Sequence, residues 1–437
     1  MRIAVLPAML IVCCNPGFAA DTPSSHGVDA PELARLGALA VGVKTLHLVQ
    51  RGQIDVLAFD ADKGSAPLAD RALTVELWYP AEPAPNAPRV VYSASLPSEL
   101  PAPPATFSIP GIAARDASAS GGGYPLVVVS HGYSNDPNAM TWLTENLASK
   151  GYVVAAIRHN DPPITDRTQF ALPLMRRPLD IAFVVQTLQR TLAADRLIDP
   201  MRTALFGYSM GGYGVLTAAG AVLDPDGGAV KRVPGGLMRP FARGGTLRDA
   251  VSVKGLRAVV AISPAGGGSL AAWGAEGLGA ITAPLLLIAG NEDRTVDYAT
   301  GARAIFDMAS AAHRYLLTFK GGGHAIGLNP VPDSMRQRLW DQDWFEDPVW
   351  RKDRINAINA HFITAFLDRH VKGDESRAAY LNVSVPESSA GVWPAAMPPP
   401  AYDAFSPGTS GVTVWKGFQR NHAAGLELLQ AEARSSP

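Results

Sequence analysis

The chain has 437 residues, of which 47% are hydrophobic and 18% are charged, and this composition excludes an intrinsically disordered protein. Its 38 Lys and Arg residues nearly balance its 39 Asp and Glu residues, so a protein that binds nucleic acid through a basic surface is also excluded. We therefore expect a folded protein, rich in loops because it has 42 glycines and 36 prolines, with a small-molecule partner.

The first 19 residues have the pattern of a secretory signal peptide. One arginine precedes an apolar stretch over residues 3–14, and residues 17–19 read G-F-A, a small-x-small cleavage site. Both cysteines, Cys13 and Cys14, lie in the apolar stretch, so the mature chain is expected to form no disulfide. A lipoprotein acylated at one of these cysteines is the alternative. We expect an exported protein, periplasmic or secreted, without a membrane span.

A single domain is expected from residue 41 to residue 425, after a loose arm over residues 20–40 that is polar and rich in Pro and Ala. Its first strands are predicted at residues 45–50 and 73–79, where β-branched and aromatic residues gather. Residues 81–123 show many Pro, Ala, Ser and Gly residues with little periodicity. This composition predicts a long surface loop and not a second domain.

From Tyr124 onward, short apolar runs alternate with helical patterns. Runs this short and continuous are typical of strands covered on both faces, which indicates a parallel sheet. The runs are residues 125–129, 152–157, 203–206, 258–262, 284–288 and 315–319. The predicted fold class is α/β, a mostly parallel doubly wound sheet with helices on both faces and a ligand crevice at the carboxyl ends of its strands.

The helices between these runs carry start and stop signals. Asp136 is the expected N-cap of one helix, with Pro137 as its first residue and Gly151 as its end. Pro178 is expected to open a second helix, whose apolar residues recur at helical spacing. The final helix is predicted over residues 354–371.

Two loop insertions interrupt the alternation, at about residues 223–254 and 328–352. Each either covers an active site or is an ordinary surface loop. Trp340, Trp344 and Trp350 lie in the second insertion, where they would roof an apolar acyl or alcohol pocket or anchor the loop onto the sheet. No Arg or Lys cluster is tied to the strand ends, so the sequence gives no reason to expect an anionic substrate.

Residues 203–219 read TALFGYSMGGYGVLTAA, an apolar strand followed by a glycine-rich turn and a helix of small residues. This order is that of a nucleophile elbow, which exposes a serine at the N-terminus of a helix. Ser209 is therefore the predicted nucleophile, in a sharp turn that forces a positive φ on this residue. The turn brings its neighbours so close that they must lack side chains, which explains Gly207, Gly211 and Gly212. The amide of Met210 is expected to donate to the oxyanion that forms during attack.

A serine nucleophile needs a base that is held by an acid, in the chain order Ser, Asp or Glu, His. His324 follows a predicted strand in a glycine-rich loop and is the expected base. Asp293 follows a strand that ends in glycine and is the expected acid, with Glu292 and Asp297 as alternatives.

The second oxyanion donor is expected from the loop after the first parallel strand, where residues 127–133 read VVVSHGY. Gly132 permits a close approach, and the amide of Tyr133 is the expected donor. His131 precedes both the elbow and the acid in the chain, so we expect it to orient this loop and not to act as the base.

With the elbow and the motifs around it, the chain resembles the secreted bacterial branch of the dienelactone-hydrolase-like α/β-hydrolases, and it is similar to the platelet-activating-factor acetylhydrolase group. The resemblance runs from about Val43 to residues 359–368 (NAHFITAFLD). The founding dienelactone hydrolases have a cysteine where this chain has Ser209, which argues against dienelactone as the substrate. In the acetylhydrolase group the acid follows an earlier strand, where residues 261–264 read AISP without a carboxylate, so Asp293 keeps that role.

Together these residues predict a serine hydrolase that cleaves a small-molecule carboxylic ester through an acyl-enzyme intermediate, with neither cofactor nor metal. Lipase, polyester hydrolase and serine peptidase activities use the same triad and remain alternatives. A non-catalytic binding protein of the same fold is the alternative from another class. An idle member usually lacks a triad residue, whereas all three are present here.

Overall fold

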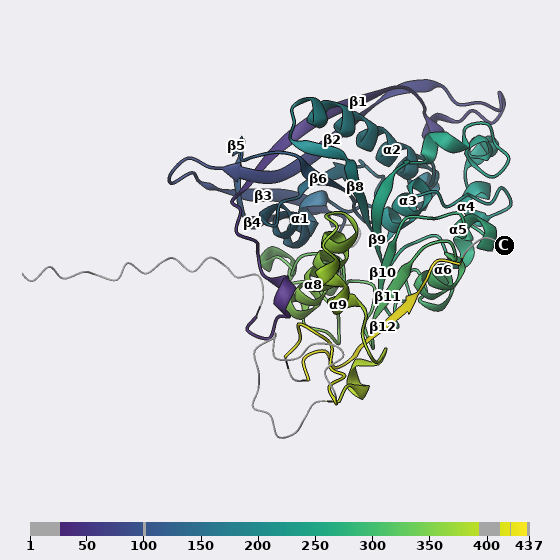
Figure 1. The fold of residues 1–437 in the computed structure, drawn as a ribbon. Helices are drawn as coiled ribbons and strands as arrows, with labels where there is room; N and C mark the ends of the chain where they lie inside the picture. Colours follow the sequence, from purple (N-terminus) through teal and green to yellow (C-terminus); the bar gives the residue numbers. More distant parts are fainter. Residues whose placement is uncertain (1–26, 99–101, 393–410, 420, 435–437) are drawn as a thin grey trace, which may run out of the picture.

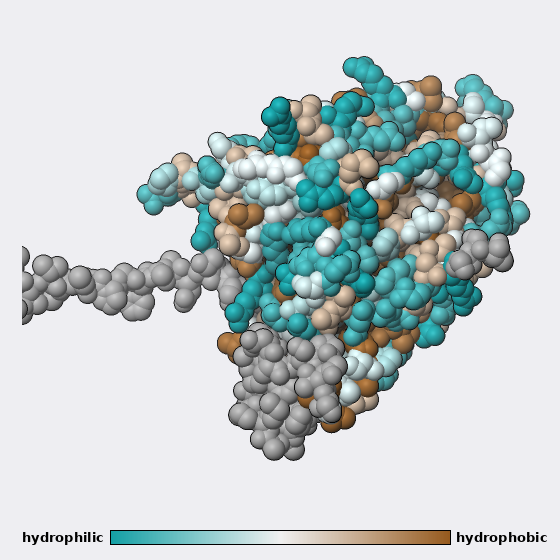
Figure 2. Space-filling view, viewed as in Figure 1, coloured by the Kyte–Doolittle hydropathy of each residue, from teal (hydrophilic) through white to brown (hydrophobic). Residues whose placement is uncertain are grey.

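The computed structural model describes residues 27–98, 102–392, 411–419 and 421–434 (Figure 1). The expected signal peptide, with Cys13 and Cys14, lies outside these residues. Within them, no helix combines the length and the apolar character that crossing a bilayer requires. On the face drawn in Figure 2, hydrophobic residues are scattered among hydrophilic ones.

In the described residues, one sheet of twelve strands has the order β12-β11-β10-β9-β8-β6-β7-β2-β1-β4-β3, with β5 paired to β2. The strands are β1 (Val41–Ile54), β2 (Leu68–Glu82), β3 (Arg89–Leu96), β4 (Ala105–Arg115), β5 (Ser118–Ala119), β6 (Tyr124–Ser130), β7 (Val153–Arg158), β8 (Ile198–Tyr208), β9 (Leu256–Ile262), β10 (Leu285–Gly290), β11 (Arg314–Phe319) and β12 (Leu426–Ala431). The strands from β7 to β11 are parallel to one another, and β2 and β12 flank them in antiparallel pairing. The predicted mostly parallel sheet is confirmed.

Helices cover both faces of this sheet (Figure 1). They are α1 (Thr141–Ser149), α2 (Ala171–Ala194), α3 (Met210–Ala218), α4 (Gly228–Lys231), α5 (Ala275–Leu278), α6 (Ala304–Met308), α7 (Leu339–Asp343), α8 (Lys352–His370) and α9 (Ala378–Leu381). Alternate residues of one strand enter different cores: Leu126 and Val128 pack with α2 and α3, whereas Val127 and Val129 pack with α1 and α8. Strands buried on both faces explain the continuous apolar runs of the sequence.

The prediction of a surface loop over residues 81–123 is wrong, because this segment forms β3, β4 and β5 and widens the sheet. In β3 only Tyr92 and Leu96 are buried, and the other positions are wholly or partly exposed. A strand with so few buried positions gives almost no hydrophobic pattern, which is why its sequence resembles a loop.

The prediction that Pro178 opens a helix is also wrong, since α2 begins at Ala171 and contains Pro178 in its interior. Proline has no N–H, so it leaves the carbonyl of Leu174 without its helical donor. The hydroxyl of Tyr213, on the neighbouring helix α3, donates to this carbonyl at 2.9 Å. A tertiary hydrogen bond thus replaces the missing helical one.

The described part of the N-terminal arm is not loose. Residues 32–34 form a short 3-10 helix, η1 (Glu32–Ala34), in which Ala34 is buried. The amide of Leu33 donates to His361 Nδ1 on α8 at 3.1 Å, and Lys150 Nζ donates to the carbonyl of Leu33. At the other end, β12 extends the domain beyond the expected limit at residue 425.

The expected helix start at Asp136 has the predicted cap but a different first turn. Asp136 Oδ1 accepts a hydrogen bond from the amide of Asn138 at 2.8 Å. The turn that follows is a 3-10 helix, η3 (Pro137–Met140), and α1 continues from it. Gly151, with φ of 86°, follows the end of α1.

Candidate active site

The turn between β8 and α3 places Ser209 at the carboxyl edge of the sheet. Ser209 has φ of 54° and ψ of −116° and directly precedes the first residue of α3. A Cβ atom on Gly207 would lie 2.3 Å from the carbonyl oxygen of Gly211, and one on Gly211 would lie 1.9 Å from that of Ser130. The turn can close this tightly only because both positions are glycine.

Ser209, His324 and Asp293 form a continuous hydrogen-bonded chain. His324 Nε2 lies 3.0 Å from Ser209 Oγ, and His324 Nδ1 lies 2.7 Å from Asp293 Oδ2. Because an ionised carboxylate only accepts hydrogen bonds, Nδ1 carries the proton and Nε2 is free to accept the proton of Ser209. The His324 side chain is 20% exposed, so solvent and a substrate can reach the triad from the side of His324.

Asp293 is buried and is fixed by the backbone that follows it. Its Oδ1 accepts hydrogen bonds from the amides of Thr295 at 3.0 Å and Val296 at 3.2 Å. Burial raises the pKa of Asp293, but the hydrogen bond and charge of His324 and the backbone donors outweigh burial, and the pKa is lowered overall. The carboxylate is therefore ionised at neutral pH and holds the imidazole in one tautomer.

The two alternative acids point elsewhere. Asp297 Oδ1 accepts hydrogen bonds from both the amide and the hydroxyl of Thr300. Glu292 lies 3.6 Å from Arg294, and more than half of each side chain is exposed. The structure thus brings Asp293 to His324 and directs its two neighbours away from the imidazole.

The loop after β6 runs beside the elbow, as expected for a second oxyanion donor. A Cβ atom on Gly132 would lie 3.2 Å from the ring of Tyr208 and 3.5 Å from Ser209 Cβ. The ring of Tyr133 packs edge-on against Phe170, with 5.3 Å between the centroids. Gly132, which precedes Tyr133, therefore lies against the elbow, and Met210 follows Ser209 as the first residue of α3.

His131 is bound within the loop backbone. Its Nε2 accepts a hydrogen bond from the amide of His159 at 3.3 Å, and its Nδ1 donates to the carbonyl of Gly132 at 2.7 Å. Burial and the charge of Arg177 lower the pKa of His131 well below its ordinary value, so the ring is neutral. These bonds fit the orienting role expected for His131.

The loop that carries His324 is held on both sides of the histidine. The amide of Gly323 donates to Asp347 Oδ2 at 2.6 Å, and Lys352 Nζ donates to the carbonyl of Ala325. Burial lowers the pKa of Lys352 to about 7, against the attraction of nearby acidic groups. Both holding residues come from the end of the 328–352 insertion and the start of α8.

Two of the three tryptophans of the same insertion, Trp344 and Trp350, anchor it. Trp350 Nε1 donates to the carbonyl of Lys320 at 2.9 Å, and its ring packs edge-on against Phe319. Trp344 Nε1 donates to the carbonyl of Pro97 at 3.1 Å. Of the two alternatives, these contacts favour anchoring onto the sheet over a pocket roof.

A buried ionic cluster, which no sequence motif predicts, lies beneath residues 131–133, the loop after β6 that is called the oxyanion loop below. It has two ion-paired groups, in which Arg71 and Arg176 bind Asp180 and Arg177 binds Asp161. His159 and Ser130 connect the two groups, because His159 lies within hydrogen-bond distance of both Asp180 and Ser130, and Arg177 donates to Ser130. Charged residues on a helix usually face solvent, so the pair of arginines in α2 carried no signal of burial. Only the tertiary structure brings their partners together.

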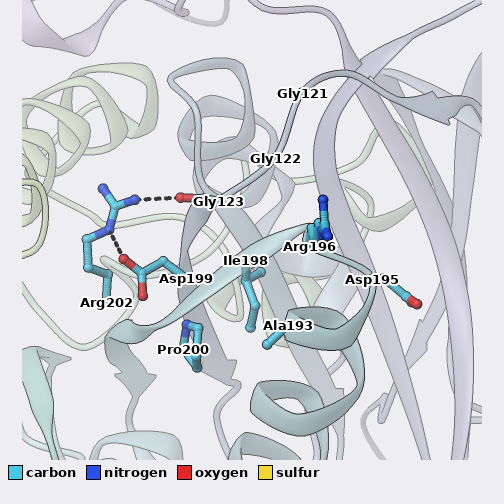
Figure 3. Close-up of a pocket in the computed structure, with 10 residues that line it drawn as sticks. All are labelled: Gly121, Gly122, Gly123, Ala193, Asp195, Arg196, Ile198, Asp199, Pro200 and Arg202. Carbon is cyan, nitrogen blue, oxygen red and sulfur yellow. Dashed lines mark hydrogen bonds and ion pairs between the residues drawn. The ribbon is translucent and has the colours of Figure 1, made fainter.

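A cavity of about 710 Å³ is lined by the residues drawn in Figure 3. It lies near the start of β8, whereas Ser209 follows the end of that strand. It is lined by Gly121–Gly123, which precede β6, and by residues at the start of β8. Arg202 in this cavity already donates to Asp199 and to the carbonyl of Gly123. A smaller cavity of about 350 Å³ is lined in part by Ser134 and Asn135. These two residues directly follow the oxyanion loop in the sequence.

Comparisons with known proteins find similarity over parts of the chain, and one of the matched parts carries the elbow. A family described as PET hydrolase-like matches residues 114–224. Cutinase est2 and cutinase est1 of Thermobifida alba are 35% and 34% identical over 97 residues, and cutinase 2 of Thermobifida cellulosilytica is 35% identical over 97 residues. Each match covers 22% of this chain, and the chain spans only 30% of the first two relatives and 34% of the third.

The likeness to a solved structure extends over most of the chain. A ferulic acid esterase from Streptomyces cinnamoneus has a TM-score of 0.50 and 23% sequence identity, and the alignment covers 79% of this chain and 94% of that chain. At this identity the likeness establishes the fold. The chain therefore has the α/β-hydrolase fold; its elbow segment is similar to the PET hydrolase-like family, and 97 of its residues are similar to the Thermobifida cutinases.

Proposed function

We propose that this protein is a serine hydrolase that cleaves carboxylic esters. The observation that carries the proposal is the hydrogen-bonded chain from Ser209 through His324 to Asp293 at a partly exposed elbow. This arrangement supplies a nucleophile, a base and an acid that orients the base, which are the parts that acyl transfer requires.

In the first half of the reaction, Ser209 Oγ attacks the ester carbonyl carbon while His324 Nε2 takes its proton. The carbonyl oxygen becomes an oxyanion, which the amides of Met210 and Tyr133 stabilise by hydrogen bonds. When the tetrahedral intermediate collapses, the C–O bond to the alcohol breaks and His324 gives its proton to the leaving oxygen. Asp293 stabilises the imidazolium that exists between these two transfers.

In the second half, water replaces the serine as nucleophile. His324 takes a proton from water, and the resulting attack on the acyl-enzyme forms a second oxyanion in the same place. Collapse of this intermediate releases the carboxylic acid and returns the proton to Ser209 Oγ. The reaction therefore consumes one water and leaves the enzyme unchanged.

The relatives support an ester as the bond that is cleaved. The family is described as PET hydrolase-like, the curated relatives are cutinases, and the solved structure is a ferulic acid esterase. The first two names favour a polyester hydrolase as a second candidate function, and the family match covers the elbow segment that would perform this chemistry.

The test is turnover of p-nitrophenyl esters of rising acyl length, from acetate to dodecanoate, by the wild type and the Ser209→Ala variant. We expect turnover by the wild type and a loss of about 10⁴-fold or more in the folded variant. Full activity of a folded Ser209→Ala variant would refute the proposal. Parallel assays on polycaprolactone and poly(ethylene terephthalate) films, with released acid as the readout, decide whether polymer esters are also substrates.

We further infer that the protein is exported. The basic residue at position 2, the apolar stretch 3–14 and the G-F-A sequence at 17–19 support this. Expression in a bacterial host followed by N-terminal sequencing of the exported form should give a chain that begins at residue 20. A chain that stays in the cytoplasm with residues 1–19 attached would contradict the inference.

A further inference from the structure

Arg177 is a fully buried arginine on α2 whose guanidinium contacts the oxyanion loop from below. Its Nη1 donates to Ser130 Oγ at 3.0 Å and to the carbonyl of His131, and its Nη2 donates to the carbonyl of Gly132 at 2.9 Å. These acceptors are the last residue of β6 and the two residues that precede Tyr133. One side chain thus binds the three consecutive residues that precede Tyr133, whose amide is the expected oxyanion donor.

The contact with Gly132 has a direct geometric consequence for Tyr133. The carbonyl of Gly132 and the amide of Tyr133 belong to the same planar trans peptide, in which C=O and N–H point in opposite directions. A carbonyl turned toward Arg177 therefore turns the amide of Tyr133 away from it. Gly132 itself lies beside Ser209 Cβ, so this peptide separates the guanidinium from the elbow.

Three donors hold the Gly132 carbonyl. Besides Arg177, the neutral His131 ring donates to it from Nδ1 at 2.7 Å, and the amide of Asn135 donates to it at 3.3 Å. A carbonyl oxygen has two lone pairs, so the capacity of this oxygen to accept hydrogen bonds is fully used. Within the described residues, the amide of Tyr133 has no hydrogen-bond partner of its own, so its direction is set by the opposite end of the peptide.

Asp161 completes the arrangement. Its carboxylate pairs with Arg177 and also accepts a hydrogen bond from the amide of Ser134 at 3.0 Å. Tyr133 is therefore held on its N-terminal side through Arg177 and on its C-terminal side through Asp161. The positive guanidinium also polarises the Gly132 peptide, which strengthens the amide of Tyr133 as a donor.

We propose that Arg177 is a positioning residue for the oxyanion hole: by binding the Gly132 carbonyl, it aims the Tyr133 amide at the oxyanion. The proposal rests on the proposed esterase function. It assigns to a buried side chain of α2 a role in transition-state stabilisation, although this side chain does not touch the substrate.

The test compares Arg177→Lys with a matched control, Arg176→Lys. Arg176 directly precedes Arg177 on α2 and is also buried, but its partners are Asp180, Gln50 and Gln53. A lysine at 177 keeps the charge but cannot span the same set of acceptors. We expect Arg177→Lys to lower kcat by about 10- to 100-fold with KM within about twofold, and Arg176→Lys to leave both within about threefold.

A second readout separates positioning from general loss of stability. An alkyl trifluoromethyl ketone forms a tetrahedral adduct with the serine, so its oxyanion occupies the hole. For Arg177→Lys we expect its inhibition constant to rise by the same factor by which kcat/KM falls, with no such rise for Arg176→Lys. Equal kinetics in the two variants, or a fall in kcat without a rise in the inhibition constant, would overturn the proposal.

Should Arg177→Lys fail to fold, Asp161→Asn tests the same idea, because it removes the charge that holds the guanidinium and retains an acceptor for Ser134. A folded Asp161→Asn variant with wild-type kcat and ketone affinity would overturn the proposal equally. Ser209→Ala keeps the two hypotheses apart: turnover by that variant refutes the esterase itself, whereas its inactivity together with an unaffected Arg177→Lys refutes only the role of Arg177.

Discussion

Ser130 Oγ lies 2.9 Å from His159 Nε2, nearly the distance that separates Ser209 Oγ from His324 Nε2. His159 Nδ1 lies in turn 2.9 Å from Asp180 Oδ2, so the fold contains a second hydrogen-bonded Ser-His-Asp chain. All three of its members are 0% exposed. Hydrogen-bond geometry alone therefore does not identify the nucleophile in this protein. The two Ser-His-Asp sets differ in whether a substrate can reach the serine.

The first prediction follows from this difference in exposure. A fluorophosphonate probe should label the wild type once, at Ser209, and should leave Ser209→Ala unlabelled. Ser130 cannot react because the probe cannot reach it and because Ser130 already binds both His159 and Arg177. Intact-mass and peptide mass spectrometry measure the stoichiometry and the site. Labelling of Ser130 in folded Ser209→Ala would contradict the prediction.

The second prediction concerns the acid. Asp293→Asn should lower kcat by roughly 10³- to 10⁴-fold with little change in KM, because the imidazole loses the partner that fixes its tautomer. Asp297→Asn and Glu292→Gln are the matched controls and should stay within about tenfold of the wild type, as nearby exposed charges only tune the imidazole. Steady-state kinetics on one p-nitrophenyl ester measure all three. A crippled Asp297→Asn beside an active Asp293→Asn would require a different triad.

The third prediction uses the backbone of the elbow. Ser209 has φ of 54°, a conformation that is strained for any residue with a Cβ atom. Ser209→Gly and Ser209→Ala both remove the nucleophile, but only glycine relieves the strain. We expect Ser209→Gly to unfold with a free energy about 1 kcal/mol higher than that of Ser209→Ala. Urea denaturation measures the difference, and a less stable glycine variant would show that the elbow stores no strain.

The fourth prediction tests the close contact behind the elbow. A Cβ atom at position 211 would lie 1.9 Å from the carbonyl oxygen of Ser130, and backbone atoms cannot yield as side chains can. Gly211→Ala should therefore destabilise the fold by at least about 3 kcal/mol or prevent folding. Gly274→Ala, whose nearest atom would be 3.9 Å away, should stay within about 1 kcal/mol of the wild type. Similar melting temperatures for the two variants would show that position 211 has room for a Cβ atom.

The fifth prediction concerns Lys352, whose pKa falls to about 7 on burial from an ordinary value of 10.5. Between these pH values the unfolded chain binds more protons than the folded one, so this group makes stability rise with pH. The free energy of unfolding of the wild type relative to Lys352→Met should therefore increase from pH 7 to pH 9.5, by up to about 1.4 kcal/mol per pH unit.

Urea denaturation at several pH values measures this difference for Lys352→Met. A constant difference over this range would show that burial does not lower the pKa of Lys352.

The parallel part of the sheet could be predicted because its strands are buried on both faces, and continuous burial produces continuous apolar runs. The elbow could be predicted because glycines at 207 and 211 are a steric requirement that few other turns share. The positions of His324 and Asp293 follow from the order of strands along the chain. For these features, local sequence reports the local environment directly.

Other features depend on distant partners and leave no such record. The strand β12 shows only two fully buried residues, Leu426 and Leu428, and becomes a strand by pairing with β11 far back in the chain. Pro178 resembles a helix start until Tyr213 supplies the missing hydrogen bond. Arg177 resembles a surface arginine until Asp161 and the carbonyls of the oxyanion loop surround it. In each case the structural role of the residue is determined by a contact with another element.

The buried ionic cluster of α2 has a consequence for behaviour on heating. Taking Arg71, Asp161, Arg176, Arg177 and Asp180 out of water costs free energy at room temperature. That cost falls on warming, because the hydration of ions becomes less favourable, whereas the gain from apolar burial levels off. The free-energy cost of holding Arg177 and Asp161 beside the oxyanion loop is therefore smallest near the temperature at which the protein unfolds.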